Sequence, residues 1–187
     1  MDHGMGNLRS VAKALEAAGA HVRLAGHPGE AEPADALCIP GQGIFGRCME
    51  ALRSSRFAEL VREWTDAGRP FLGICLGMQV LFESSEEGGV AGLGILGGTV
   101  KRLPGGVVVP HIGWNTVASG TGDTYYYFDH SYAVHAAEDS IVSGWTDHGG
   151  CWAASVRTGS ITGVQFHPEK SGRDGIALLR RWRDEAV

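Results

Sequence analysis

The alternation of short apolar runs with helix-periodic segments is the feature of this sequence that most constrains its fold. The runs ALCI (36–39) and FLGI (71–74) are continuous apolar stretches of strand length, as expected for parallel strands that are buried on both faces. Segments 7–18, 47–52 and 56–67 instead carry apolar residues at helical spacing. Strands that alternate with helices predict an α/β fold with a mostly parallel central sheet flanked by helices.

The second half of the chain has a different pattern, which predicts additional antiparallel strands. From about Thr99, short runs rich in Val, Tyr and Trp are separated by glycines, as in strands joined by tight turns. These runs lie at 99–103, 106–110, 114–118, 125–129, 131–135, 140–145, 151–156 and 161–166. We also predict a short strand at 21–25, a helix at 76–83 and an amphipathic helix at 174–185 that closes the chain.

The length and composition predict a single globular domain over residues 1–187. The chain has 187 residues, of which 43% are hydrophobic and 20% charged, and a chain of this length can be stabilised by one core. Its net charge is −5 and it has no basic run, so a nucleic acid is not expected as a partner. No stretch is long and apolar enough to cross a membrane.

The cysteines and histidines do not predict a metal site. The four cysteines are scattered and form no CxxC pair, which favours a reducing compartment and a cytoplasmic location. They are Cys38, Cys48, Cys75 and Cys151. The histidines His111, His130, His135 and His148 fit no ligand spacing, so no metal is expected.

Cys75 is the candidate nucleophile. It lies in GICLG (73–77), directly after the predicted strand 71–74 and before a predicted helix. The glycines on either side permit the sharp strand-to-helix turn of a nucleophile elbow, with Cys in place of Ser. The start of a helix carries partial positive charge and unpaired N–H groups, which stabilise a thiolate and an oxyanion. The alternative is a buried structural cysteine, which is the commoner role of a single Cys.

His167 and Glu169 are the candidate base and its orienting carboxylate. They lie in QFHPE (165–169) at the end of a predicted strand. Pro168 favours an extended His167, and residues two apart in an extended chain point the same way, so the carboxylate would fix the imidazole tautomer. The alternative is a strand-end histidine beside a solvated glutamate. Because parallel strands end at one edge of a sheet, we expect Cys75 and His167 to meet there.

The loop PGQG (40–43), which follows the predicted strand 36–39, is expected to complete the site. Its glycines allow the backbone to turn N–H groups toward the sheet edge. We assign one oxyanion donor to the backbone N–H of Leu76 and the second to Gly43 or a neighbour. An ordinary glycine-rich turn is the alternative.

Six segments together resemble class I glutamine amidotransferases and, within that class, the glutaminase subunits of imidazole glycerol phosphate synthase in histidine biosynthesis. They are DHGMGNLRSV (2–11), PGQGIFGRCMEAL (40–52), GICLGMQVLFESSEE (73–87), PHIGWN (110–115), YYFDHSYAV (126–134) and GVQFHPEKSG (163–172). The resemblance runs from one end of the chain to the other. It implies the class I glutamine amidotransferase-like fold, glutaminase activity and no cofactor.

The resemblance also implies roles for single residues. Cys75 attacks the side-chain amide of L-glutamine, His167 transfers protons and Glu169 orients His167. A glutamyl thioester forms on the cysteine, and water hydrolyses it to glutamate. The residues implied to bind glutamine are Gly41, Gln79, His130, Ser131 and Tyr132.

A partner subunit is implied as well. In the family, ammonia passes to a (βα)₈-barrel synthase subunit, which forms a heterodimer with the glutaminase and makes imidazole glycerol phosphate and an aminoimidazole carboxamide ribotide. Asn7, Trp114 and Lys170 match positions near that interface; a helix cap, a packed aromatic residue and a solvated lysine are the alternatives. Such glutaminases are nearly idle until the partner binds its ligand. An oxyanion donor in 40–43 that points away would explain this, since one lost donor costs about 10²–10³ in rate.

The sequence departs from the family pattern at three points. The apolar strand that usually precedes the DxGxGN segment is missing before Asp2, so we expect a misassigned start codon or a trimmed sequence. Without that strand, a parallel sheet would expose ladder groups and apolar surface. His3 stands where Tyr is common, and Asp129 stands where an apolar residue is common.

Three other functions stay open at this point. The ammonia could serve an anthranilate, aminodeoxychorismate, guanylate or pyridoxal phosphate synthase, although PHIGWN and HPEKSG argue for the histidine pathway. The chain could be another thiol hydrolase, such as a γ-glutamyl hydrolase, which Gln79 and the segment 130–132 disfavour. It could also be an inactive module that only binds a partner, which the three filled triad positions disfavour.

Overall fold

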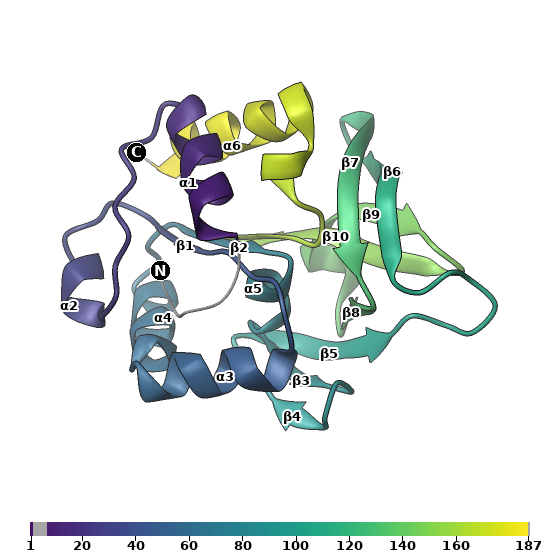
Figure 1. Cartoon of the computed structure of the whole chain (residues 1–187), viewed down its shortest axis with the longest axis horizontal. Coiled ribbons are helices and arrows are strands. Elements are labelled where there is room, and N and C mark those ends of the chain that lie inside the picture. Colours follow the sequence, from purple (N-terminus) through teal and green to yellow (C-terminus); the bar gives the residue numbers. More distant parts are fainter. Residues whose placement is uncertain (2–6, 187) are drawn as a thin grey trace.

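One sheet runs through the molecule, with helices on both of its faces (Figure 1). The structure is a computed structural model that describes Met1 and residues 7–186, and eleven strands of this part form the sheet. The strands are β1 (Leu37–Ile39), β2 (Phe71–Ile74), β3 (Phe82–Ser85), β4 (Val90–Ala91), β5 (Leu96–Arg102), β6 (His111–Ser119), β7 (Gly122–His130), β8 (Tyr132–Ala136), β9 (Val142–Asp147), β10 (Cys151–Thr158) and β11 (Ile161–Val164). Their order is β1-β2-β11-β10-β8-β5-β3-β4, and β9, β6 and β7 extend the sheet from β10.

The helices form a layer on each side of the sheet. Figure 1 shows α1 (Leu8–Ala17) and α6 (Gly172–Ala186) on one side, and α3 (Phe45–Ser54) and α4 (Phe57–Asp66) on the other. The shorter elements are α2 (Pro28–Ala31), α5 (Leu76–Gln79) and the 3₁₀ turns η1 (Asp139–Ile141) and η2 (Pro168–Lys170). Within the part of the chain that the structure describes, no helix combines the length and apolar composition needed to span a bilayer.

The strand β2 is buried on both faces, which explains its continuous apolar sequence. Phe71 packs in the same cluster as Trp64 of α4, whereas Leu72 and Ile74 pack in the cluster that contains Leu179 of α6. Successive side chains of a strand point to opposite faces, so β2 contributes to both hydrophobic cores. The two helix layers are therefore held to one strand, whose C-terminal end carries the candidate nucleophile.

The strand directions are mixed. Parallel pairing is confined to β1–β2, β2–β11 and β3–β5, and the other pairs are antiparallel. The predicted α/β class, the flanking helices and the antiparallel strands of the second half are confirmed. The sheet as a whole is mixed instead of mostly parallel, because the chain returns from β6 to β11 through short turns, which can only join antiparallel neighbours.

The strand β1 pairs with β2 on one side, and no other described strand pairs with it. The ammonium of Met1 donates a hydrogen bond to the carbonyl of Cys38 (2.8 Å). The predicted strand at 21–25 is wrong: this segment is irregular, since a strand exists only through ladder hydrogen bonds that no described neighbour supplies. The strand expected before Asp2 and the departure at His3 lie outside the described residues.

Backbone hydrogen bonds and exposure correct two further predictions. The predicted helix 76–83 ends at Gln79, because the carbonyls of Val80, Leu81 and Phe82 accept hydrogen bonds from the N–H groups of residues 93–95 (2.8–3.2 Å). The chain then turns into β3. The predicted strand 106–110 is a loop between β5 and β6. Its Val108 is 79% exposed, so this apolar side chain does not pack in a hydrophobic core.

Candidate active site

Cys75 lies at a sharp turn between β2 and α5. Its backbone has a positive φ (53°, with ψ −109°), which strains a residue with a side chain and persists only where the surroundings enforce it. Its backbone N–H donates to the carbonyl of Val164 on β11 (2.7 Å). The turn has the geometry of the predicted nucleophile elbow, while the role of Cys75 as nucleophile stays a prediction.

Glycines are required at this elbow because backbones touch there. A Cβ atom on Gly77 would collide with the carbonyl oxygen of Ile39, and one on Gly73 would lie 2.5 Å from the carbonyl oxygen of Gly77. A Cβ atom on Gly41 would lie 2.5 Å from Cβ of Leu76. Gly41 thus packs against the elbow, and its predicted contact with the substrate stays a prediction.

His167 follows β11 and is fixed through its backbone. Its N–H donates to the carbonyl of Tyr127 on β7 (2.8 Å), and its carbonyl accepts from the hydroxyl of Ser171 (2.6 Å). Its Nδ1 lies 2.8 Å from Oε1 of Glu169. Because an ionised carboxylate can only accept, Nδ1–H donates to it, and Nε2 is the nitrogen available for chemistry.

Glu169 reaches His167 from a 3₁₀ turn. The backbone of His167 is extended as predicted (φ −103°, ψ 96°), but Pro168 begins η2. The predicted pairing of the two side chains is confirmed, and the argument that both lie on one extended segment is wrong. The two side chains are 2% and 1% exposed. Nε2 of His167 and Oε2 of Glu169 have no hydrogen-bond partner among the described residues.

The pKa of His167 is raised to about 10. Burial lowers the pKa of this ring, but hydrogen bonding and charge interactions with Cys75 and Glu169 outweigh that effect. Nε2 of His167 has no hydrogen-bond partner among the described residues. The sulfur of Cys75 therefore acts on the ring mainly through charge, which needs no close alignment of the two groups. The site favours an imidazolium ring between two acidic groups.

Sheet register brings these side chains together. Ile74 at the end of β2 is level with Val164 at the end of the parallel neighbour β11. Cys75 and His167 therefore emerge at the same edge of the sheet, as we expected from the sequence.

Cys75 lines a cavity of about 310 Å³. The predicted residues that share this cavity are Gly43, Leu76, Gln79, His130, Ser131 and Tyr132. Four other residues line it, namely Gln42, Glu87, Pro110 and Asp129, and none of them was predicted from the sequence to bind the substrate. The carboxylate of Glu87 accepts a hydrogen bond from the N–H of Phe45 (2.7 Å). In the sequence, Glu87 is the last residue of the segment GICLGMQVLFESSEE, and the acidic end of this segment could have indicated its presence at the site.

Two chains of hydrogen bonds meet at the carbonyl of Tyr132 beside the cavity. Nε2 of Gln79 (2.8 Å) and Nδ1 of His130 (2.9 Å) both donate to it. Nε2 of His130 must then accept from Nδ1–H of His111 (3.0 Å), whose Nε2 accepts from the side-chain amide of Asn115 (3.2 Å). Each ring has one donor and one acceptor nitrogen, so both histidines are neutral.

Burial reinforces this neutral state. It lowers the pKa of His130 to about 3 and that of His111 to about 4. The ring of His111 is stacked between Phe128 and His148, with centroid distances of 4.7 and 4.0 Å. Within Met1 and residues 7–186, no group of three or more His, Cys, Asp or Glu side chains is placed to hold a metal ion.

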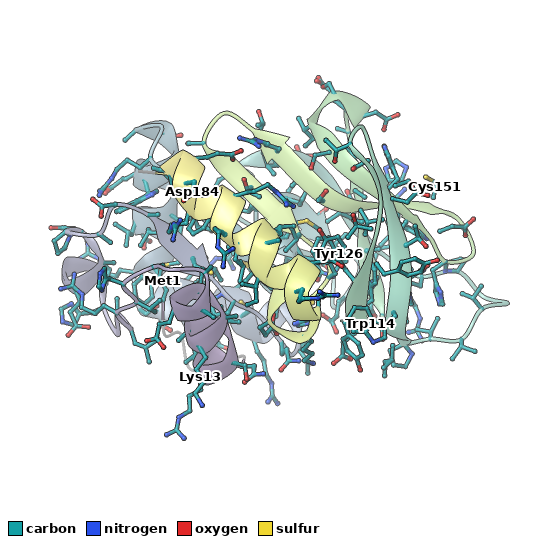
Figure 2. The ribbon with its side chains drawn as sticks, turned by 90° about the horizontal axis from the view of Figure 1, so that it is seen from above. Met1, Lys13, Trp114, Tyr126, Cys151 and Asp184 are labelled. Carbon is teal, nitrogen blue, oxygen red and sulfur yellow. The ribbon has the colours of Figure 1, made fainter. Side chains whose placement is uncertain are left out.

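Apolar side chains are exposed on the outward face of the paired strands β6 and β7. Ile112, Trp114 and Tyr125 are 59%, 57% and 61% exposed, and the register of the two strands places them on the same face. Figure 2 shows Trp114 projecting outward from this part of the sheet. Three large exposed apolar side chains on one face are typical of a protein–protein contact.

Lys170 and Asn7, the other predicted interface residues, are held differently. Nζ of Lys170 lies 3.1 Å from Oδ2 of Asp129 and 5.4 Å from the ring centroid of Tyr127. Asn7 occupies the N-cap position of α1 and its carbonyl accepts from the N–H of Val11 (3.1 Å), but its side chain makes no capping hydrogen bond. The side chain of Asn7 is thus not needed as a cap, and the interface roles of both residues stay predictions.

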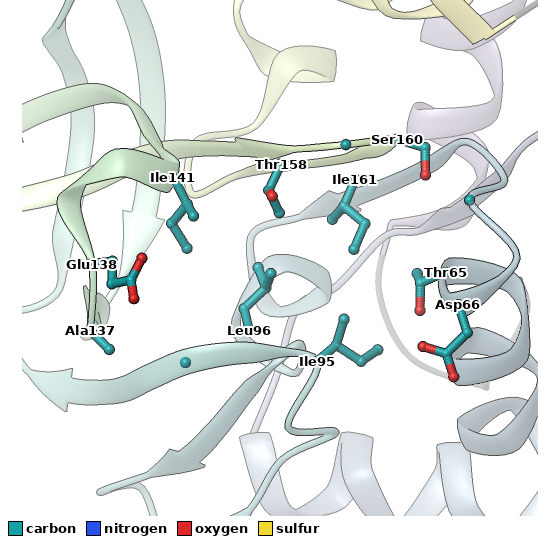
Figure 3. Close-up of a pocket in the computed structure, with 13 residues that line it drawn as sticks. Thr65, Asp66, Ile95, Leu96, Ala137, Glu138, Ile141, Thr158, Ser160 and Ile161 are labelled. Atoms are coloured by element: carbon teal, nitrogen blue, oxygen red, sulfur yellow. The ribbon is translucent and has the colours of Figure 1, made fainter.

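A larger cavity of about 510 Å³ lies at the opposite edge of the sheet (Figure 3). It is lined by the end of α4, the start of β5 and the start of β11, with Asp66 and Glu138 as its charged residues. No cysteine or histidine lines it. Its size therefore does not make it the reaction site, because it offers no nucleophile or base of the required kind.

The fold and the site define a class of protein. Residues 1–183 match the family model described as glutamine amidotransferase class-I, and the chain belongs to this family. A structure described as a crystal structure of glutamine amidotransferase has the same fold, with a TM-score of 0.79, 22% identity, and coverage of 97% of this chain and 95% of the other.

The names of similar proteins indicate which kind of glutamine amidotransferase the chain resembles. The chain is 45% identical to the imidazole glycerol phosphate synthase subunit HisH of Moorella thermoacetica, over 97% of this chain and 91% of that protein. It is 42% identical to the subunit of the same name from Oceanobacillus iheyensis, over 98% of this chain and 96% of that protein.

Proposed function

We propose that this chain is the glutaminase subunit of imidazole glycerol phosphate synthase. In this role it hydrolyses L-glutamine to glutamate and ammonia, and a (βα)₈-barrel synthase subunit uses the ammonia to make imidazole glycerol phosphate and aminoimidazole carboxamide ribotide in histidine biosynthesis. The observation that carries the proposal is the strained Cys75 elbow beside the buried His167–Glu169 pair. Similarity of 42–45% over nearly the whole chain supports the choice of pathway.

The geometry supports a thioester mechanism. The Cys75 thiolate attacks the amide carbon of the glutamine side chain, and the N–H groups of Leu76 and Gly43 stabilise the oxyanion. His167 donates its proton to the leaving nitrogen, so that the C–N bond breaks and ammonia departs. His167 then takes a proton from water, which attacks the thioester; the C–S bond breaks and glutamate leaves. Glu169 holds Nδ1–H throughout (2.8 Å).

The lining of the cavity supports a way to hold the amino-acid end of glutamine. Gln79 uses both hydrogens of its amide, toward Tyr132 and Gln165 (2.8 and 3.0 Å), so it offers its oxygen to a ligand. The carboxylate of Glu87 lines the same cavity. Both groups attract the α-ammonium of the substrate, while His130, Ser131 and Tyr132 line the part that receives the rest of its amino-acid end.

The outward face of β6 and β7 is the surface that we assign to the synthase partner in a heterodimer. Trp114 contributes a large exposed aromatic side chain, and aromatic residues are enriched at the centre of such interfaces. Lys170 and Asn7 complete the predicted contact. We assign residues 1–187 to one domain and the complex to the cytoplasm.

Glutamate release tests the proposal directly. The chain is assayed for glutamate formed from glutamine, alone and with a barrel synthase of the histidine pathway plus its nucleotide ligand, with Cys75→Ala as control. We expect a large rise with synthase and ligand that the alanine variant abolishes. Equal activity with a guanylate or anthranilate synthase would assign a different partner, and no activity in any mixture would favour a module that only binds.

A further inference from the structure

Gln165 is a fully buried amide next to the reacting sulfur. It follows β11, and its side chain is 1% exposed. Its backbone N–H donates to the carbonyl of Ala154 (2.8 Å). Its neighbours Val164 and Phe166 pack in the core beneath α1 and α6, so Gln165 points to the other face of the sheet, where α5 lies.

The directions of the side-chain hydrogen bonds of Gln165 follow from the carbonyl of Tyr132. A carbonyl can only accept, so Gln79 turns its NH₂ group toward it (2.8 Å). The other hydrogen of that NH₂ group reaches Oε1 of Gln165 (3.0 Å). The NH₂ group of Gln165 is then left to face Cys75, with Nε2 at 3.5 Å from Sγ.

The same carbonyl is held from its second side. Nδ1–H of His130 donates to it (2.9 Å), and His130 is itself fixed by Nδ1–H of His111 (3.0 Å). The Tyr132 carbonyl therefore accepts two hydrogen bonds from buried donors. If Gln79 flipped, its oxygen would face both the Tyr132 carbonyl oxygen and Oε1 of Gln165, so the side-chain oxygens of Gln79 and Gln165 would be left without this donor. The orientation of Gln165 toward the sulfur is set by this arrangement.

We propose that Gln165 is a further catalytic residue, whose side-chain N–H donates a hydrogen bond to Cys75 Sγ and stabilises the thiolate, while Gln79 and the carbonyl of Tyr132 keep this donor in place. The proposal rests on the proposed thioester chemistry. A hydrogen bond to a charged acceptor is roughly twice as strong as a neutral one. Gln165 therefore stabilises the negative charge on the sulfur when the thiolate attacks the substrate and again when it leaves the thioester.

A neutral donor complements His167 because it has no proton to give away. The imidazolium must lose its proton to the departing ammonia, whereas the amide of Gln165 stays a donor at every step. The carboxylate of Glu169 lies behind His167, and Glu87 and Asp129 line the cavity that Cys75 also lines. Among these acidic residues, the amide of Gln165 offers the sulfur a fixed neutral donor.

Alkylation of Cys75 by iodoacetamide as a function of pH tests this role without glutamine. Cys151 is exposed, so the background is Cys151→Ser, with Cys75→Ala added as a blank. Burial raises the pKa of both Cys38 and Cys48 to about 12, so we expect little alkylation of these thiols, and the blank measures it. In Gln165→Leu we expect the midpoint pH of alkylation to rise by about one unit, and the alkylation rate at neutral pH to fall about tenfold.

A second variant separates this role from a structural one. Gln165→Glu keeps the volume and the acceptor for Gln79 but replaces the donor with an oxygen, so we expect a shift in the same direction, and it carries the test if the leucine variant does not fold. With the synthase present, kcat falls in both variants and KM changes little, because Gln165 does not line the cavity. An unchanged alkylation midpoint in the folded variants would overturn the proposal. If glutamate release fails for the parent chain, the proposed function is wrong, and the alkylation result still decides the role of Gln165.

Discussion

Buried histidines lie in two clusters of the candidate active site: the cluster of His167 favours a positively charged ring, and the cluster of His130 and His111 favours neutral rings. His167 is surrounded by acidic partners, and its pKa is raised to about 10. His130 and His111 are hydrogen-bonded to each other and to neutral groups, and burial lowers their pKa values to about 3 and about 4. Burial acts in the same direction on all three rings, so the partners decide the charge.

The difference assigns separate tasks to the two clusters. The proposed triad needs a ring that can hold a proton and transfer it, and the pairing of His167 with Glu169 at 2.8 Å would provide that ring. The histidines of β6 and β7 need fixed tautomers, because they position the carbonyl of Tyr132 that orients Gln79 (2.8 Å). In the proposed mechanism, His167 moves protons, whereas His130 and His111 set the direction of hydrogen bonds.

The largest expected effect is on the kinetic constants, kcat and KM, which should change differently when a histidine of each cluster is replaced. His167→Asn removes the proton-transfer group, so we expect kcat with synthase present to fall by about 10²–10⁴-fold or more. His130→Asn is the matched change in the neutral cluster, and it should mainly raise KM, since His130 lines the proposed substrate cavity. Steady-state glutamate release measures both variants. An equal loss of kcat in the two would show that the clusters share the chemistry.

A smaller effect should appear in the pH dependence of stability. His130 and His111 have lowered pKa values, so below about pH 6.5 the unfolded chain binds protons that the folded chain does not. Stability should therefore fall with acidification from about pH 6.5 toward about pH 4, at up to about 1.4 kcal/mol per pH unit for each ring. His167 has a raised pKa, so its contribution is complete below about pH 6.5 and is lost as pH rises toward about 10.

Urea unfolding at a series of pH values checks these signs. The His130→Asn variant should have a flatter slope on the acid side, because one of the two neutral rings is gone. His167→Asn should flatten the alkaline side instead. An acid slope that is the same in His130→Asn and in the parent chain would contradict the neutral state that we assign to His130.

The smallest expected effect concerns the ion pair between β7, which carries His130, and η2, which carries Glu169. Asp129 of β7 pairs with Lys170 of η2 at 3.1 Å, and the two side chains are 34% and 29% exposed. Partly exposed pairs of this kind contribute up to about 1 kcal/mol. Asp129→Asn should therefore change the free energy of unfolding by less than about 1 kcal/mol. It should also alter the salt dependence of binding to the synthase, since Lys170 loses its intramolecular partner. Unfolding curves and titrations at low and high salt measure the two effects.

Much of the site was readable from local sequence, because local rules govern those positions. FLGI predicted β2, and the glycines around Cys75 predicted the elbow, since backbone contacts there exclude a Cβ atom. The segment 76–83 shows where such reasoning fails. The predicted helix does begin at Leu76, but hydrogen bonds from residues 93–95 end it at Gln79. The strand predicted at 21–25 is wrong for a similar reason, because a strand depends on a neighbouring strand that is distant in sequence.

The sequence by itself determined the reactive groups and the turns that carry them: a cysteine between glycines, a histidine held extended by Pro168, and a carboxylate two residues beyond. Only the tertiary structure decided the charge states, because these depend on contacts between β2, β7, β8 and β11. The same holds for Gln165, which is 90 residues from Cys75 in sequence and 3.5 Å from its sulfur. Its orientation depends on a carbonyl of β8, and no local pattern encodes a hydrogen bond across the sheet.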